Sequence, residues 1–265
     1  MKAARFQYDR PARLDDALKV IAAGGSMVVS GSQSLGPMLN LRLAQPEALV
    51  DVSLLPELRG YAEDSEGLII GAGVTHAEIE DGLLPDLTNG ILPRVAAGIA
   101  YRAVRNRGTI GGSLAHADPA ADWVSSLMAL DAEVLLRSAR GARRMRLTDF
   151  VTGAFATARR DDEILVAVRI RQVHRDSRFG YFKTCRKTGE LARAIGVVFQ
   201  AAAEDRTRVV MGATGGRPVV VDASGLPDEA MLSAALETEA PTIDEIDSAV
   251  YLEVVRRAAR MSEVA

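Results

Sequence analysis

The sequence has very few of the side chains that hold metals. It contains one cysteine, Cys185, and three histidines, His76, His116 and His174. A single cysteine forms no disulfide within the chain and cannot supply the thiolates of an iron–sulfur cluster. The histidines are scattered, with no H-x-x-x-H spacing and no paired carboxylate, which argues against a zinc site within this chain. If the chain belongs to a redox enzyme, its metal centres must lie on other polypeptides.

Positive charge and long apolar runs are also lacking. The formal net charge is −3 and aromatic residues make up 5% of the chain, so nucleic acid and anionic membranes are not expected as partners. No apolar run reaches the roughly 20 residues that span a bilayer. The first six residues lead into a strand-like segment without the apolar core of a signal peptide. We therefore expect a cytoplasmic protein.

The composition that remains is typical of a folded chain with a sizeable core. The chain has 265 residues, of which 48% are hydrophobic and 25% charged, enough for two or three subdomains. Apolar residues recur at helical spacing over residues 14–23, just before Gly24 and Gly25, and short apolar strands are predicted at 27–30 and 49–52. This strand–helix–strand order predicts a small α/β unit with parallel pairing.

The rest of the chain predicts mixed and antiparallel structure. Thr75 and Glu78 have the spacing of a capping box, and residues around Gly141 have the pattern of a hairpin. Further strands are predicted at 68–71, 163–170, 179–184, 194–201, 208–211 and 218–221, and further helices at 91–100, 228–236 and 243–261. The predicted fold class is α+β, with domains at residues 1–56, 57–172 and 173–265.

A glycine-rich stretch stands between residues 105 and 122, reading R-N-R-G-T-I-G-G-S-L-A-H-A-D-P-A-A-D. Gly111 and Gly112 let the backbone approach a ligand closely, and free N–H groups there could hold a pyrophosphate. Asp118 is expected to cap the following helix, with Pro119 at its first position. A plain tight turn would use the same residue types.

A second loop of similar composition lies at residues 28–37, reading V-V-S-G-S-Q-S-L-G-P. It leaves a short apolar strand, turns through glycine and hydroxyl residues, and enters a short helix near Pro37. Two such loops could hold one dinucleotide from two sides. This interpretation requires Gly31 and Gly111 to face a common cleft.

Four ordered motifs carry a resemblance to a known family. They are G-S-Q-S-L-G-P-M-L-N-L-R-L-A, L-V-D-V-S-L-L-P-E-L-R-G, I-G-A-G-V-T-H-A-E-I-E and T-I-G-G-S-L-A-H-A-D-P-A-A-D. Together they resemble the FAD-binding medium subunit of molybdenum hydroxylases, such as carbon monoxide dehydrogenase and xanthine dehydrogenase flavoproteins. The resemblance implies a two-lobed FAD-binding domain of the vanillyl-alcohol-oxidase-like type and a C-terminal domain of antiparallel strands and helices.

The resemblance also implies a function and partners. The chain would hold FAD, receive electrons from the [2Fe-2S] clusters of a small partner subunit, and pass them to an external acceptor. A large partner would carry the molybdenum cofactor, in a dimer of heterotrimers. Two other functions stay open: a self-sufficient FAD-dependent oxidoreductase, and a non-catalytic nucleotide-binding assembly module. No acid–base or nucleophilic residue is required for electron transfer, and none is evident.

The predicted cofactor-binding residues come from both loops and from scattered positions that match the family. The loops supply Val29, Ser30, Gly31, Ser32, Gln33, Ser34, Leu35, Thr109, Ile110, Gly111, Gly112 and Ser113; the other positions are Ile99, His116, Asp118, Asp122, Leu165 and Lys183. Ser30, Ser32 and Ser113 stand where the family usually has Ala, Gly and Asn.

Several of these residues have a structural interpretation as well. Asp122 matches an aspartate that binds the ribose region of FAD, but it could equally complement the dipole of a helix start. Lys183 could approach the flavin or its phosphates, or be solvated. Ile99 and Leu165 could be core residues, and His116 a packing residue. Two arginine groups, around Arg105 and Arg143, are expected to form a solvated face or, second, a subunit interface.

Overall fold

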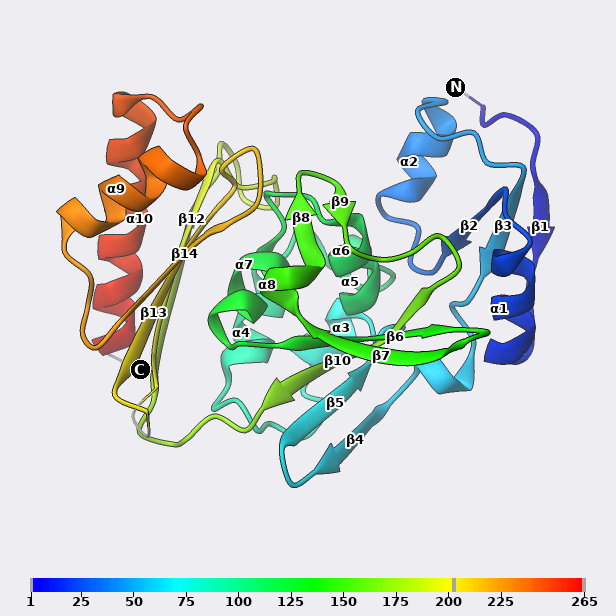
Figure 1. Cartoon of the computed structure of the whole chain (residues 1–265), viewed down its shortest axis with the longest axis horizontal. Helices are drawn as coiled ribbons and strands as arrows, with labels where there is room; N and C mark the ends of the chain where they lie inside the picture. Colours follow the sequence, from blue (N-terminus) through cyan, green and yellow to red (C-terminus); the bar gives the residue numbers. More distant parts are fainter. Residues whose placement is uncertain (1, 202–203, 264–265) are drawn as a thin grey trace.

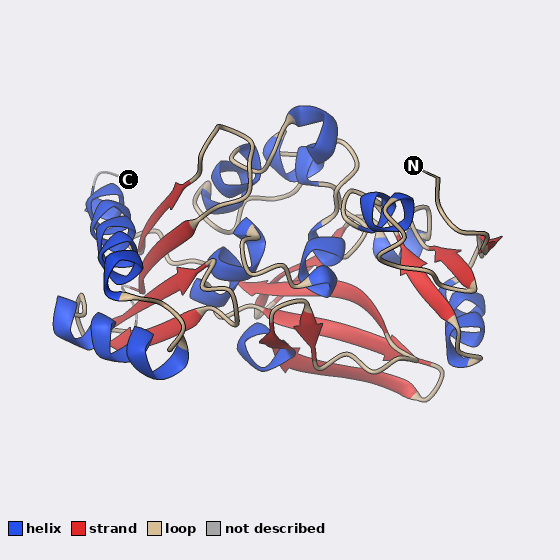
Figure 2. Cartoon of the chain, turned by 90° about the horizontal axis from the view of Figure 1, so that it is seen from above, coloured by secondary structure: helices blue, strands red, loops and turns tan. Residues whose placement is uncertain are grey.

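Three sheets of three to five strands follow one another along the chain, each in a separate lobe, and a fourth sheet of two strands lies in the middle lobe (Figure 1). In this computed structural model, residues 2–201 and 204–263 are described. The N-terminal lobe comprises β1–β3 with α1 and α2, the middle lobe β4–β10 with η1 and α3–α8, and the C-terminal lobe β11–β14 with α9 and α10. Seen from above, the middle lobe lies between the other two (Figure 2).

The N-terminal lobe is a small parallel α/β unit, as predicted. Its strands pair in parallel in the order β1-β3-β2. Its elements are β1 (Gln7–Asp9), α1 (Leu14–Ala22), β2 (Ser26–Val29), α2 (Leu35–Asn40) and β3 (Ala48–Asp51). Because the strands are parallel, the loop that leaves β2 lies at the carboxyl edge of the sheet, where α/β folds commonly bind ligands.

The middle lobe is built on an antiparallel sheet in the order β4-β5-β10-β6-β7. Its strands are β4 (Tyr61–Asp64), β5 (Gly67–Gly71), β6 (Glu133–Ser138), β7 (Gly141–Arg146) and β10 (Ile164–Arg171), with a separate pair β8 (Val151–Gly153) and β9 (Ala156–Thr157). Its helices are η1 (Pro56–Leu58), α3 (His76–Glu80), α4 (Ile91–Ala97), α5 (Arg102–Arg105), α6 (Ile110–His116), α7 (Asp122–Ala129) and α8 (Leu147–Phe150). The capping box at Thr75 and Glu78 is confirmed. Strand β4 was not predicted, because all four of its side chains are exposed and show no alternation.

The prediction for residues 105–122 was wrong in two respects. The stretch is not one long loop, because residues 110–116 form α6. Asp118 does not cap α7, which begins at Asp122 after Ala121. Instead the Asp118 carboxylate accepts a hydrogen bond from the Ala120 N–H at 2.9 Å and closes a turn. An Asp-Pro pair starts turns as readily as helices, and here the turn form is adopted.

Helix α7 is buried on every side rather than along one apolar face. All of its residues are buried, including Trp123, the single tryptophan of the chain. The helix packs against α6 and α4 of its own lobe and against β12 and β13 of the C-terminal lobe. It is therefore the shared core element of the two lobes.

The C-terminal lobe is an antiparallel meander with two helices, as predicted. Its elements are β11 (Arg178–Thr184), β12 (Ala194–Ala201), β13 (Arg206–Gly212), β14 (Val219–Ala223), α9 (Glu229–Glu239) and α10 (Glu245–Glu263). Helix α10 lies very close to the sheet, because a Cβ on Gly180 would come within 2.6 Å of the Ala258 carbonyl carbon. No helix in the described ranges is long and apolar enough to cross a membrane.

The predicted α+β fold class is confirmed by these three lobes. The domain boundaries predicted at residues 56/57 and 172/173 fall between sheets, and the division into three domains stays a proposal.

Candidate cofactor site

The loop after β2 presents a row of unused main-chain donors. The N–H groups of residues 31–35, here called the amide nest, donate no hydrogen bond to any other residue within the described ranges. Ser32 has a φ of 59°, in the left-handed region, which turns the chain into α2. Successive free N–H groups next to a left-handed residue form a concave anion site. The amide nest therefore suits a phosphate or diphosphate.

A buried hydroxyl at the entrance to the amide nest also lacks a partner. Ser30 Oγ is shielded from solvent and forms no hydrogen bond to any described residue. A buried hydroxyl without a partner destabilises the fold by about 1–3 kcal/mol. Its neighbours Gln33 and Ser34 are exposed, and Val29 is buried at the end of β2. Such a donor is explained if a bound ligand accepts its hydrogen bond.

The second glycine bend, residues 109–113, differs from the amide nest. Its N–H groups are used within the chain: Ile110 donates to the Val74 carbonyl and Gly111 to the Ala72 carbonyl, both at 3.0 Å. The Gly112 N–H donates to Thr109 Oγ1 at 3.1 Å, which caps α6. The prediction that Gly111 and Gly112 offer free amides was therefore wrong. Glycine is needed at 111 because a Cβ there would lie 2.7 Å from the Ala72 Cα.

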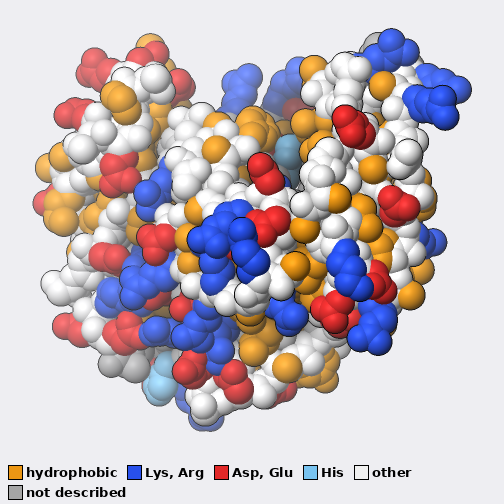
Figure 3. All heavy atoms as spheres, turned by 45° about the vertical axis from the view of Figure 1, so that its right-hand side comes forward, with side chains coloured by type: hydrophobic (Ala, Val, Ile, Leu, Met, Phe, Trp, Pro, Cys, Tyr) orange, Lys and Arg blue, Asp and Glu red, His pale blue; other side chains and the backbone are white. Residues whose placement is uncertain are grey.

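The two bends nevertheless lie against each other. A Cβ on Gly31 would come within 2.8 Å of the Arg107 carbonyl carbon and 2.9 Å of the Gly108 Cα. Arg107 and Gly108 directly precede the second bend, so the two glycine regions are neighbours in the fold; that Gly31 and Gly111 face a common cleft stays a prediction. Figure 3 shows a hollow in the surface between the N-terminal lobe, at the upper right, and the rest of the molecule.

Comparison with known proteins decides the class of ligand. A sequence model of the family described as FAD binding domain in molybdopterin dehydrogenase matches residues 4–171. The chain belongs to this family. FAD is thus the cofactor, as predicted, and the chain is a flavoprotein component of an oxidoreductase.

Named relatives and solved structures agree with the family. The 6-hydroxypseudooxynicotine dehydrogenase complex subunit alpha of Paenarthrobacter nicotinovorans is 36% identical over 194 residues, which are 72% of this chain and 66% of that protein. The nicotine 6-hydroxylase medium subunit of the same organism is 35% identical over 219 residues, 82% of this chain and 76% of that protein. The structure of carbon monoxide dehydrogenase from Hydrogenophaga pseudoflava superposes with a TM-score of 0.87 at 26% identity, covering 100% of this chain and 99% of that one.

The residues of this FAD-binding domain fit the charged part of the cofactor. FAD carries an anionic diphosphate, and the amide nest offers N–H donors with no competing internal acceptor. Ser30 Oγ adds a buried hydroxyl without a partner in the described ranges. The replacement of Gly by Ser at position 32 is accommodated, since Ser32 adopts the left-handed conformation that glycine would favour.

Asp122 lies in a buried polar cluster that joins two lobes of the FAD-binding protein. Its Oδ1 accepts hydrogen bonds from the Tyr181 hydroxyl and from Lys183 Nζ, both on β11. Lys183 Nζ also donates to the Gly98 carbonyl at 2.8 Å. Burial, and then the charge of Asp122, raise the pKa of Tyr181 well above its ordinary value. Lys183 is therefore paired with Asp122.

The remaining predicted residues divide between core and surface. Leu165 is buried on β10, and Ile99 packs partly buried against the same core, next to Gly98. The His116 ring lies 5.1 Å from the ring of exposed Phe155, so a packing role is realised. Ser113 lies in α6, with its N–H bonded to the Thr109 carbonyl.

Most of the arginines of the two basic groups are neutralised by carboxylates of the chain. Arg102 and Arg105 pair with Glu80, and Arg143 pairs with Glu163. Arg107 and Arg146 are exposed and form no ion pair with another described residue, and Arg94 donates instead to the Phe179 carbonyl at 2.8 Å.

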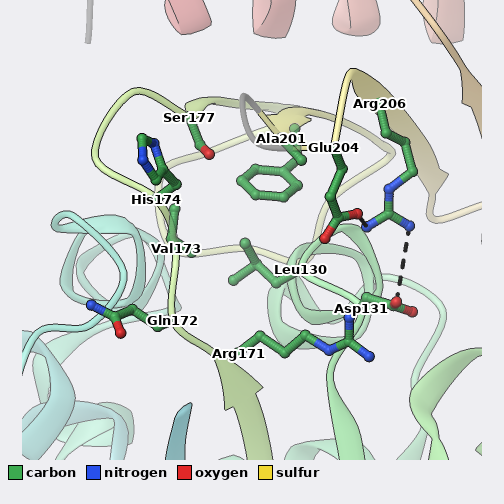
Figure 4. A pocket seen from close by; sticks show the side chains of 11 residues that line it. Leu130, Asp131, Arg171, Gln172, Val173, His174, Ser177, Ala201, Glu204 and Arg206 are labelled. Carbon is green, nitrogen blue, oxygen red and sulfur yellow. Dashed lines mark ion pairs between the residues drawn. The ribbon is translucent and has the colours of Figure 1, made fainter. Parts of the chain in front are cut away.

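One cavity lies away from all predicted site residues. It encloses about 90 Å³ at the junction of the middle and C-terminal lobes and is lined by residues such as Leu130, Arg171 and Phe199 (Figure 4). Arg206 lies there between Glu204, at 2.9 Å, and Asp131, at 3.9 Å. Opposite charges are thus balanced within the cavity. No group of His, Cys, Asp and Glu side chains suited to a metal ion occurs in the described ranges.

Proposed function

We propose that this chain is the flavin subunit of a multi-chain molybdenum hydroxylase, and that it passes electrons from partner [2Fe-2S] clusters through FAD to an external acceptor. Relatives are named as medium or FAD subunits of such enzymes, which supports the proposal. A chain with one cysteine cannot supply the ligands of these clusters, so they belong to a partner. The proposed assembly contains a large molybdenum subunit and a small iron–sulfur subunit, as a dimer of heterotrimers.

The amide nest is the observation that carries the proposal for this chain. The diphosphate of FAD would lie on the N–H groups of residues 31–35, with Ser30 Oγ as an additional donor. Gly31 allows the nest to rest directly on the backbone of Arg107 and Gly108. The resulting site spans the N-terminal and middle lobes.

Other predicted residues would orient the rest of the cofactor. The Asp122 Oδ2 atom accepts no hydrogen bond from a described residue, since Tyr181 and Lys183 both bond to Oδ1. We assign Oδ2 as the acceptor for a ribose hydroxyl. Ile99 would supply apolar contact beside the Lys183–Gly98 hydrogen bond.

FAD, when bound, supplies the one- and two-electron redox chemistry. The chain holds it, excludes water by its packed lobes, and keeps the cofactor in a fixed place for the partner. The cytoplasmic location expected from the N-terminal residues stays a prediction.

The test of the cofactor site compares two glycine substitutions. Gly31→Ala places a methyl group against the main chain of Arg107, whereas Gly216→Ala meets no atom within 4 Å. We expect the wild-type chain and the Gly216→Ala control to retain FAD, seen in the visible spectrum and by mass spectrometry of the released nucleotide. We expect Gly31→Ala to lose FAD affinity by about tenfold or more. Full flavin content in Gly31→Ala would contradict the site.

The electron-transfer role is tested with partner subunits. The complex is purified through this chain, and the flavin absorbance is followed after addition of a substrate of the large subunit. Bleaching that requires both unlike chains supports the proposal. Bleaching by the isolated chain would favour a self-sufficient oxidoreductase, and no bleaching in the complete complex would favour an assembly module.

A further inference from the structure

A buried histidine outside the predicted site connects α7 to the turn beneath the amide nest. His76 is the first residue of α3 and is 6% exposed. Its Nδ1 accepts a hydrogen bond from the indole N–H of Trp123 at 3.0 Å. Because an indole can only donate, Nδ1 is the unprotonated nitrogen and Nε2 carries the hydrogen of the neutral ring. The ring orientation is thereby fixed from the α7 side.

The opposite edge of the same ring supports Gly108. The main-chain N–H of His76 donates to the Gly108 carbonyl at 2.9 Å, and a Cβ on Gly108 would lie 2.8 Å from Nε2 of the His76 ring. The next contact in the series joins Arg107 and Gly108 to Gly31, where a Cβ would lie 2.8 Å from the Arg107 carbonyl carbon. Trp123, His76, the 107–108 turn and the amide nest thus form a continuous packed series with no space between its members.

We propose that His76 is a positioning residue that sets the height of the 107–108 turn under Gly31 and so holds the amide nest in its diphosphate-binding shape. This inference rests on the proposed function. Packed interiors transmit displacements because they have few voids. A turn displaced outward would push on the Gly31 backbone, because Gly31 lies directly against Arg107 and Gly108.

The ring is suited to this role because it stays neutral. Burial lowers the pKa of His76 to about 4, and the positive charge of Arg105 adds to the effect. A neutral ring keeps the Nδ1 lone pair available to Trp123 across the physiological pH range. The contact between His76 and Trp123 is also a tilted ring pair, with centroids 6.1 Å apart.

The test uses the full chain freed of its flavin, with two substitutions at position 76. His76→Phe keeps an aromatic ring but provides no acceptor for Trp123, whereas the amide oxygen of His76→Gln can accept that hydrogen bond. We expect His76→Phe to weaken FAD binding by about tenfold or more and His76→Gln by about threefold or less. Binding is measured by equilibrium dialysis of FAD.

A second readout follows the turn itself. The Gly108 N–H donates to the Val104 carbonyl at 2.7 Å, so hydrogen exchange in a peptide covering residues 104–112 reports on the position of the turn. We expect faster exchange there in flavin-free His76→Phe. The control is Leu232→Ala, a substitution in the separate C-terminal core cluster that lowers stability without touching the series.

The outcomes separate the two proposals. Unchanged FAD affinity in His76→Phe would overturn the positioning role alone. So would an equal loss of affinity in Leu232→Ala, since affinity would then simply follow stability. A wild-type chain without affinity for FAD would overturn the proposed function together with this inference.

Discussion

Two glycine bends of similar composition do different work in this protein. In the first, residues 31–35, the N–H groups have no acceptor in the described chain, and Ser30 Oγ is buried without a partner. In the second, residues 109–113, the N–H groups of Ile110, Gly111 and Gly112 all donate to atoms of the chain. The first bend has donors to give to a ligand, while the second is a packed helix start.

The difference shows that glycine in a cofactor protein can serve the cofactor indirectly. Gly111 permits α6 to approach Ala72, and this contact fixes the bend on which the amide nest rests through Arg107 and Gly108. Binding donors are useful only when they are held in place, so the second bend supports the first. Substitutions in the two bends should therefore separate stability from affinity.

The largest effect is expected for Gly111→Ala. Its Cβ would lie 2.7 Å from the Ala72 Cα and 2.8 Å from the Ala72 carbonyl oxygen, which are main-chain atoms that cannot move aside. We expect a loss of about 3 kcal/mol in the free energy of unfolding, measured with urea, with flavin lost in parallel. Gly112→Ala meets only the Thr109 side chain and should lose less. A stable Gly111→Ala protein that lacks flavin would show instead that this bend binds FAD directly.

The free energy of unfolding should depend on pH through His76, which packs against Gly108 next to the second bend. The folded pKa of His76 is about 4, below its ordinary 6.5, so between these values the unfolded chain binds the extra proton. The free energy of unfolding should therefore fall as the pH is lowered through this window, by about 2 kcal/mol between pH 7 and 5.

The control for this pH dependence is a second histidine. His76→Phe should abolish the part of the pH-dependent fall in unfolding free energy that comes from His76. His174→Phe, which alters an exposed ring, should leave that fall unchanged. Urea unfolding at pH 7 and pH 5 measures the difference. Equal slopes in wild type and His76→Phe would show that His76 is not held neutral in the fold.

A smaller effect is expected at the cap of α6. Thr109→Ala removes the hydroxyl that accepts from the Gly112 N–H, and should destabilise the fold by about 1 kcal/mol. The free energy of FAD binding should change by no more than the free energy of unfolding does. Thr109→Ser keeps the acceptor and should match the wild type. An affinity loss much greater than the stability loss would place the Thr109 hydroxyl on the cofactor.

The smallest effect is expected at Ser30. Its substitution should stabilise the flavin-free protein but weaken the binding of FAD. Ser30→Ala removes a buried hydroxyl that has no partner in the described chain, so the flavin-free protein should become slightly more stable. FAD affinity should fall by about fivefold, which corresponds to one hydrogen bond of roughly 1 kcal/mol. Thermal unfolding with and without FAD measures both changes. Equal affinity would mean that Ser30 does not contact the cofactor.

Local patterns predicted most elements of the fold, and their failures have physical causes. The capping box at Thr75 and the meander from β11 to β14 were visible because their signals lie within a few residues. Strand β4 was invisible because it is exposed on both faces. Asp118 was misassigned because an aspartate before proline suits both a helix start and a turn.

The sequence singled out two loops that lie against each other, but it could not predict which of their N–H groups are already bonded within the chain. The N–H of Gly111 is bonded to the Ala72 carbonyl, and the Lys183 ammonium is bonded to the Asp122 carboxylate. In each pair the two residues lie far apart in the sequence. Only the fold reveals such pairings. For the same reason, His76 could not be linked to the amide nest from sequence alone.

Close packing of α10 on β11 connects the polar cluster at Asp122 to the last helix of the chain. Gly180 touches the backbone at Ala258, and the next residues along β11 include Tyr181 and Lys183, which hold Asp122. The last helix thus fixes the position of the strand that carries Tyr181 and Lys183, although the helix itself lies on the outer side of the C-terminal sheet (Figure 1). A chain truncated before residue 258 would lose the helix surface that supports β11. The hydrogen bonds from Tyr181 and Lys183 to Asp122 would then be weakened.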